Sequence, residues 1–146
     1  MKRIRIFYFL DPMSGSGTSQ DVAEELHIPS VLYDLNPHPP KGIGNWNALK
    51  DEVAHSADLI FFHPPYHDII QYSGNMWGRP HEDDLSRCEN YEDYIEKLNY
   101  VIKKLVFQPK TEWVSGNSGR RYPAERRLSF YCSRYASYWK YEVLDC

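Results

Sequence analysis

The chain of 146 residues contains little cysteine and no long apolar run, and both absences restrict what it can be. Cys88, Cys132 and Cys146 form no close pair and no metal-ligand spacing, which fits a reducing compartment and predicts no metal site. No stretch approaches the roughly 20 apolar residues that span a bilayer. The apolar start is too short for a signal peptide, and Arg5 interrupts it. We therefore expect a cytoplasmic protein without a membrane partner.

A uniform excess of positive charge is also absent, because the formal net charge is −3. This excludes a histone-like polyanion binder. Residues 1–109 carry a net charge of −6, however, and residues 110–146 carry +3. The basic part interleaves arginines with aromatic residues, and its candidate nucleic-acid-binding residues are Arg120, Arg121, Arg126 and Arg127. A solvated basic tail is the alternative interpretation.

Length and composition are those of one globular domain spanning residues 1–146. Apolar β-rich runs predict strands over 4–10, 31–33 and 58–62, with weaker patterns at 112–115, 128–132 and 141–144. Helical spacing and capping residues predict helices over 18–27, 47–55 and 89–107, the last capped by Asn90. Strands that alternate with helices indicate an α/β domain with a mostly parallel sheet. Residues 67–88 form a long predicted loop, a length that is uncommon without a function.

Two motifs follow predicted strands, where α/β sheets bind ligands. The first is Asp11-Pro12-Met13-Ser14-Gly15-Ser16-Gly17-Thr18, whose glycines allow a ligand to approach the backbone. It is neither a Walker loop, since no Lys follows the second Gly, nor a dinucleotide fingerprint. Asp34 ends the next strand, where an acidic residue can hold a ribose diol. A plain tight turn and a turn-capping Asp remain the alternatives.

The second motif is His63-Pro64-Pro65-Tyr66, and the pair of motifs carries a family resemblance. Segment 11–18 resembles the S-adenosylmethionine loop of amino-methyltransferases, D-P-F-x-G-S-G-T. Segment 62–73 resembles their D/N/S-P-P-Y/F/W catalytic segment. The run 84–86 and the helix after it are similar to the next stretch of site-specific DNA methyltransferases, as in restriction–modification. The likeness covers roughly residues 4–107 and implies a Rossmann-like methyltransferase fold in a short or truncated version.

The resemblance also implies a cofactor site for S-adenosylmethionine. Asp11 would serve the methionine end of the cofactor, and Asp34 would serve the ribose hydroxyls. The segment at Asn45 resembles the family's G-D-x and would serve the adenine amino group. The implied cofactor-binding residues are Asp11, Met13, Gly15, Gly17, Thr18, Asp34, Asn45 and Trp46.

The implied catalytic residues are His63, Pro64, Pro65 and Tyr66. Tyr66 would stack on the extruded base, and the Pro64 carbonyl would accept a proton of its exocyclic amine. His63 departs from the family pattern, since a His accepts a hydrogen bond only when neutral and through one nitrogen. It either accepts from the amine or merely fills a strand end. No Pro-Cys dipeptide occurs, which argues against methylation of a cytosine ring carbon.

The resemblance implies methyl transfer to adenine N6 or cytosine N4 in DNA. The alternatives are an RNA guanine-N2 methyltransferase and a catalytically inert nucleic-acid-binding or regulatory subunit. No separate recognition region has room, so a partner subunit is one possible source of target recognition. Tyr72 and Trp77 either touch the target strand or only cover the pocket. Residues 81–84 are interpreted as a solvated acidic loop rather than a metal site.

Overall fold

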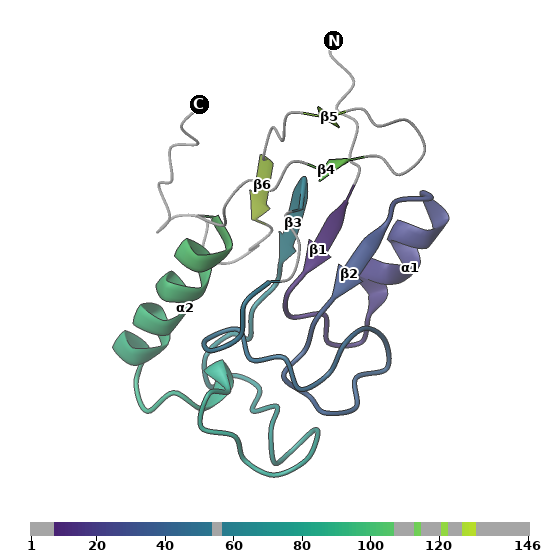
Figure 1. The fold of residues 1–146 in the computed structure, drawn as a ribbon. Coiled ribbons are helices and arrows are strands. Elements are labelled where there is room, and N and C mark those ends of the chain that lie inside the picture. Colours follow the sequence, from purple (N-terminus) through teal and green to yellow (C-terminus); the bar gives the residue numbers. More distant parts are fainter. Residues whose placement is uncertain (1–7, 54–56, 107–112, 115–120, 123–126, 131–146) are drawn as a thin grey trace.

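The structure, a computed structural model, describes residues 8–53, 57–106, 113–114, 121–122 and 127–130 (Figure 1). Four strands form a parallel sheet in the order β2-β1-β3-β6. Their bounds are β1 Phe9–Asp11, β2 Ser30–Leu32, β3 Leu59–Phe62 and β6 Arg127–Phe130. A separate antiparallel pair consists of β4 Trp113–Val114 and β5 Arg121–Tyr122. The predicted α/β class and the parallel pairing are confirmed.

Two α-helices accompany the sheet, α1 Thr18–Glu25 between β1 and β2, and α2 Tyr91–Val106 before β4. A short 3-10 helix, η1 Leu85–Arg87, precedes α2. The predicted cap of α2 is confirmed, because the Asn90 side chain accepts a hydrogen bond from the Asp93 backbone N–H at 2.8 Å. In Figure 1, α1 lies beside β2 and α2 lies at the opposite side of the sheet.

The strands place alternate residues in two apolar clusters. Leu10, Ile60 and Phe62 pack with the buried face of α2, which consists of Tyr94, Leu98, Val101, Ile102 and Leu105. The second cluster joins Phe9, Leu32 and Ala23 of α1 with Leu59 and Phe61. Full burial of one large apolar side chain stabilises a fold by about 1.5–3 kcal/mol. The two clusters cover both faces of β3, which explains why the run 59–62 is apolar throughout.

The predicted helix over 47–55 is wrong for the residues that the structure describes. Residues 47–53 make one turn, in which the backbone N–H groups of Lys50 and Asp51 donate to the Asn47 carbonyl. The Asn47 side chain accepts from the Leu49 N–H, and the Asp51 carboxylate accepts from the Asn47 N–H. Asn and Asp side chains compete in this way with the helical backbone ladder.

Other predicted elements are shorter than expected or lie outside the described residues. Segment 4–7 of the first predicted strand and the whole of segment 141–144 are outside them. Directly after β2, a single parallel bridge joins Tyr33 to Ile43. In the part of the chain that is described, no helix has the length and apolar character needed to cross a membrane.

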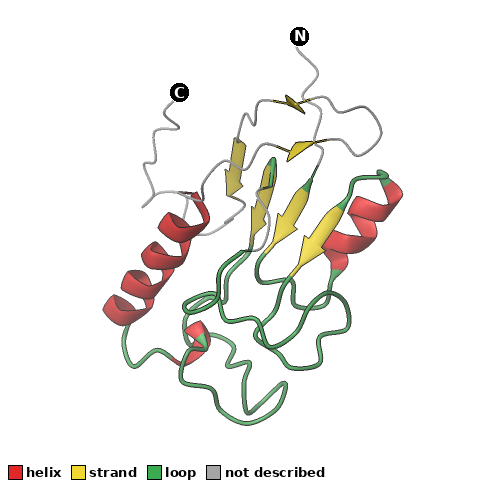
Figure 2. Ribbon diagram, in the orientation of Figure 1, coloured by secondary structure: helices red, strands yellow, loops and turns green. Residues whose placement is uncertain are grey.

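The order of the strands creates a crevice at one edge of the sheet. From β1 the chain moves to β2 on one side and then returns to β3 on the other. The segments that follow β1 and β3 therefore leave their strands in different directions, and such a switch point is where α/β sheets bind ligands. Figure 2 shows the long green loops gathered at this edge, below the strands.

Candidate functional site

A cavity of about 530 Å³ lies at the carboxyl edge of the sheet. Its wall includes residues 12–16, which follow β1, and His63 and Pro65, which follow β3. The structure thus brings the two sequence motifs to one cavity. Small-molecule sites in proteins commonly measure about 300–1,000 Å³.

The Asp11 carboxylate fixes the conformation of the loop after β1. Its side chain is buried, and its two oxygens accept from the Met13 N–H at 3.1 Å and the Ser19 hydroxyl at 2.5 Å. Burial raises the pKa of Asp11, and the bonds from Ser19 and Met13 partly oppose that rise. Met13 lines the cavity and Asp11 does not, so Asp11 acts through the loop.

The two glycines of this loop have different surroundings. Gly15 lines the cavity with φ +52°, and a Cβ placed on it would meet no atom within 4 Å. Gly17 has φ +80°, and its Cβ would lie 2.7 Å from the Lys41 Cβ, outside the cavity wall. Thr18 is exposed and shares a hydrogen bond with the Ser16 hydroxyl. Gly15 is therefore the glycine that leaves space for a ligand.

Asp34 connects the loop after β2 to the loop after β1. Its carboxylate accepts from the N–H of Gly15 and of Asn36, each at 2.8 Å, and it lines the cavity. Burial raises the pKa of Asp34, the two backbone bonds oppose the rise, and the charge of Asp84 adds to it. A carboxylate has about four acceptor sites, so both oxygens can still accept from a ligand.

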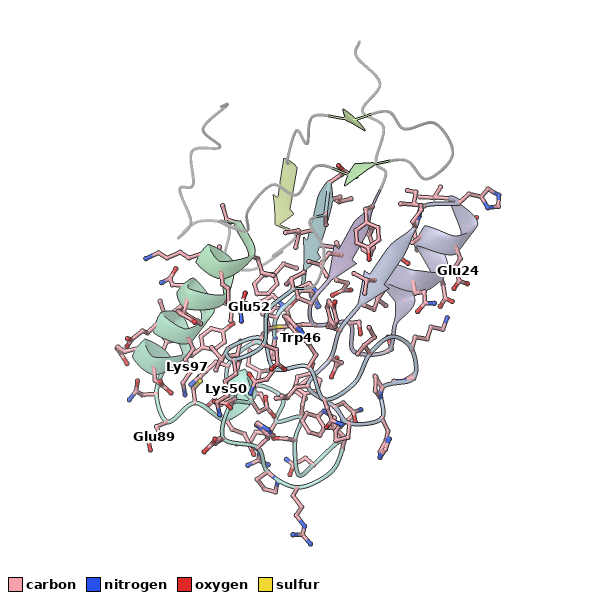
Figure 3. The ribbon with its side chains drawn as sticks, viewed as in Figure 1. Glu24, Trp46, Lys50, Glu52, Glu89 and Lys97 are labelled. Atoms are coloured by element: carbon pink, nitrogen blue, oxygen red, sulfur yellow. The ribbon has the colours of Figure 1, made fainter. Side chains whose placement is uncertain are left out.

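Trp46 forms part of both the core and the cavity wall (Figure 3). Its ring stacks on Tyr33 with centroids 4.6 Å apart, and its indole N–H donates to the Glu52 carbonyl at 3.2 Å. Asn45 is exposed with φ +55° and is not part of the wall. Of these two predicted cofactor residues, the structure brings only Trp46 to the cavity.

The His63–Tyr66 segment forms a turn fixed by two hydroxyl groups. His63 Nε2 and Tyr66 Oη are 2.6 Å apart, with the two rings edge to face. The Tyr94 hydroxyl donates to the Pro65 carbonyl at 2.6 Å. Within the described residues, no hydrogen bond reaches the carbonyl of buried Pro64. His63 and Pro65 line the cavity, whereas Pro64 and Tyr66 are not among its wall residues.

The long loop over 67–88 supplies another part of the wall, which includes Tyr72, Met76 and Trp77. Buried Asp84 organises it, accepting from the Ser73 N–H at 2.7 Å and from the Ser86 N–H and hydroxyl at 2.9 and 2.6 Å.

Asp84 was not predicted as a site residue. Burial alone would raise its pKa, but the bonds from Ser73 and Ser86 prevail and hold the pKa of Asp84 below its ordinary value. The interpretation of 81–84 as a solvated acidic loop is therefore wrong for Asp84, which is 3% exposed. The available signal was Ser86, two residues after Asp84, whose hydroxyl donates to the carboxylate; Ser73 donates through its backbone N–H, which a residue of any type but proline offers.

The cavity wall is acidic. Asp34, Asp83 and Asp84 contribute to it, and no Lys or Arg does so within the described part of the chain. Lys50, which is exposed, pairs with Asp83 at 2.6 Å from outside. The described residues contain no group of three or more side chains suited to a metal ion. The wall therefore suits an uncharged or cationic ligand better than a phosphorylated one.

Two of the four predicted arginines fall in strands that the structure describes. Arg121 begins β5 and Arg127 begins β6. Arg120 and Arg126 lie outside the described residues.

Comparisons with protein-family models, with curated proteins and with solved structures gave no match for this chain.

Proposed function

We propose that the chain is an S-adenosylmethionine-dependent methyltransferase with a Rossmann-like fold. More specifically, we propose that it methylates adenine N6 or cytosine N4 in DNA, in the cytoplasm. The observation that carries this is the single cavity walled by Met13–Ser16 and by His63 and Pro65, the loops with the two methyltransferase-like motifs. The parallel order β2-β1-β3-β6, extended by the Tyr33–Ile43 bridge beyond β2, is compatible with such a fold.

The residues of the cavity fit the proposed cofactor in shape and charge. The space above Gly15 admits a ligand against the backbone, and Asp34 offers free lone pairs to a ribose diol. Asp34 and Asp84 in the wall favour a ligand with a net positive charge, whereas the charge of Asp83 is balanced by Lys50. When bound, S-adenosylmethionine supplies a methyl group on a positively charged sulfur.

The His63–Tyr66 turn would orient the amine that receives the methyl group. An exocyclic amine conjugated with its ring is a weak nucleophile, and acceptors on its N–H groups stabilise the charge that develops on nitrogen. The resemblance assigns one acceptor role to the Pro64 carbonyl, which accepts no hydrogen bond within the described residues, although Pro64 itself is not a wall residue. His63 would supply the second acceptor through Nε2, once the Tyr66 hydroxyl releases that nitrogen.

A second candidate function, an inert nucleic-acid-binding or regulatory module, is favoured by one observation. His63 stands where the family has Asp, Asn or Ser, and its Nε2 already bonds to Tyr66. Calorimetric titration with S-adenosylmethionine separates the two, because an inert module with a decayed loop gives no heat.

Tritiated methyl transfer to mixed DNA and RNA tests the proposed activity. Label in DNA supports it, whereas label only in RNA indicates a guanine-N2 or other RNA methyltransferase. If label appears only after a partner subunit is added, recognition comes from that partner. Cofactor binding without label in either nucleic acid would refute the proposed reaction.

A further inference from the structure

The side chain proposed from sequence to stack on the target base does not face the cavity. Tyr66 is not part of the wall, and its hydroxyl bonds to His63 Nε2. The aromatic rings that belong to the wall on this side come instead from the next loop, at Tyr72 and Trp77, with Met76 beside them. The aromatic part of this wall therefore comes from residues that follow His63-Pro64-Pro65-Tyr66 in the chain.

The loop that carries these rings is anchored from within. A bridge joins Ser73 to Trp77, and the Gly74 N–H donates to the Trp77 carbonyl at 2.7 Å. Ser73 is fully buried, with its N–H bonded to Asp84 and its carbonyl accepting from Arg87 Nε at 2.6 Å. A rigid support of this kind suits a binding surface, because little side-chain and loop entropy is lost on binding.

Tyr72 belongs to the same cavity wall as residues of both motifs. That wall includes Gly15 of the first motif, His63 of the second, and Asp34, the carboxylate proposed for the ribose. Burial raises the pKa of Tyr72, and Tyr66 and Asp84 add to that rise. Trp77 is half-buried on the same loop.

We propose that Tyr72 and Trp77 form the stacking wall that holds the target base against the His63 turn. The ligand class is a flat, uncharged heteroaromatic ring with an exocyclic amine, whose phosphates stay outside the cavity. The acidic wall without Lys or Arg among the described residues supports this separation, because it would repel a phosphate. The inference rests on the proposed function and moves the stacking role from Tyr66 to the loop over 72–77.

Steady-state methyl transfer to a single-stranded oligonucleotide containing adenine and cytosine tests the inference, with three variants. Trp77→Leu removes the ring, Trp77→Phe keeps an aromatic face, and Ile69→Ala alters a residue of the same loop that is 60% exposed and lies outside the cavity wall. Base–aromatic stacking is lost in Trp77→Leu, so its KM for the oligonucleotide should rise at least about fivefold. Trp77→Phe should recover most of that loss, and Ile69→Ala should remain within about twofold of the unmodified chain.

Calorimetry with S-adenosylmethionine, performed on the same preparations, distinguishes a failure of the proposed function from a failure of the inference alone. If the unmodified chain gives no heat, the proposed function fails and the inference fails with it. If all variants bind the cofactor equally and Trp77→Leu keeps its KM, the inference alone is overturned. If Trp77→Leu has also lost cofactor binding, its KM no longer reports on the base alone, and Tyr72→Leu then decides the matter by the same KM criterion.

Discussion

Replacing Asp84 by asparagine is expected to lower the free energy of unfolding by about 3 kcal/mol. The Asp84 carboxylate is 3% exposed and accepts three hydrogen bonds of 2.6–2.9 Å from Ser73 and Ser86. Asparagine keeps one acceptor oxygen and turns an NH₂ group toward a donor. At least one bond to a charged acceptor is then lost, at about 1.5–3 kcal/mol, and a buried donor is left unsatisfied at a further 1–3 kcal/mol.

The same substitution should change how stability depends on pH. The pKa of Asp84 is lowered in the folded chain, so the folded state binds its proton less readily than the unfolded state. This contribution is complete above the unfolded pKa of about 3.9 and is lost as the pH falls through the folded value. Asp84→Asn should therefore lose less stability than the unmodified chain between pH 5 and pH 3.

Urea unfolding followed by circular dichroism at pH 7 and at pH 3.5 measures both effects. Glu82→Gln is the matched control, because the Glu82 side chain is 81% exposed and bonds only to exposed Lys50 among the described contacts. Its unfolding free energy should stay within about 0.5 kcal/mol of the unmodified value. An Asp84→Asn chain as stable as that control would refute the role given to the buried carboxylate.

Other changes give independent expectations. Gly15→Ala should stay folded, with a loss of about 1–2 kcal/mol for its left-handed backbone, while calorimetry shows S-adenosylmethionine binding weakened about tenfold or more. His63→Ala should lower the methyl-transfer rate by about tenfold or more while calorimetry still shows S-adenosylmethionine binding; a rate equal to that of the unmodified chain would remove His63 from the reaction. Burial raises the pKa of Cys88 to about 11, so peptide mapping after iodoacetamide treatment at pH 8 should find Cys88 unmodified in the folded chain. Tyr94→Phe leaves the Pro65 carbonyl without its donor and should reduce stability by about 1–2 kcal/mol in urea unfolding.

The local sequence pattern was sufficient to predict the elements whose hydrogen-bond partners are close in sequence or whose faces are fully buried. The apolar run over 59–62 predicted β3, and the spacing from Tyr91 to Leu105 predicted α2. The capping role of Asn90 follows from atoms three residues away, so no tertiary information was needed. The helix predicted over 47–55 was wrong because Asn47 and Asp51 bind the backbone of their own turn.

The positions of both motifs at strand ends were also readable from the sequence, because prolines and glycines mark where strands stop. The sequence did not indicate which residues of the two motifs face the cavity. Gly15 lines it and Gly17 packs on Lys41, although the two are chemically identical and only two positions apart.

The tertiary structure alone decided the remaining wall of the site. Asp84 is buried because Ser73, eleven residues earlier, and Ser86 surround its oxygens, and that contact brings Tyr72 and Trp77 to the cavity. An acidic run without these partners would be solvated, and sequence patterns do not report which distant donors meet a carboxylate. Short-range hydrogen bonding and hydrophobic periodicity act along the chain, whereas burial of a charge depends on groups that only folding brings together.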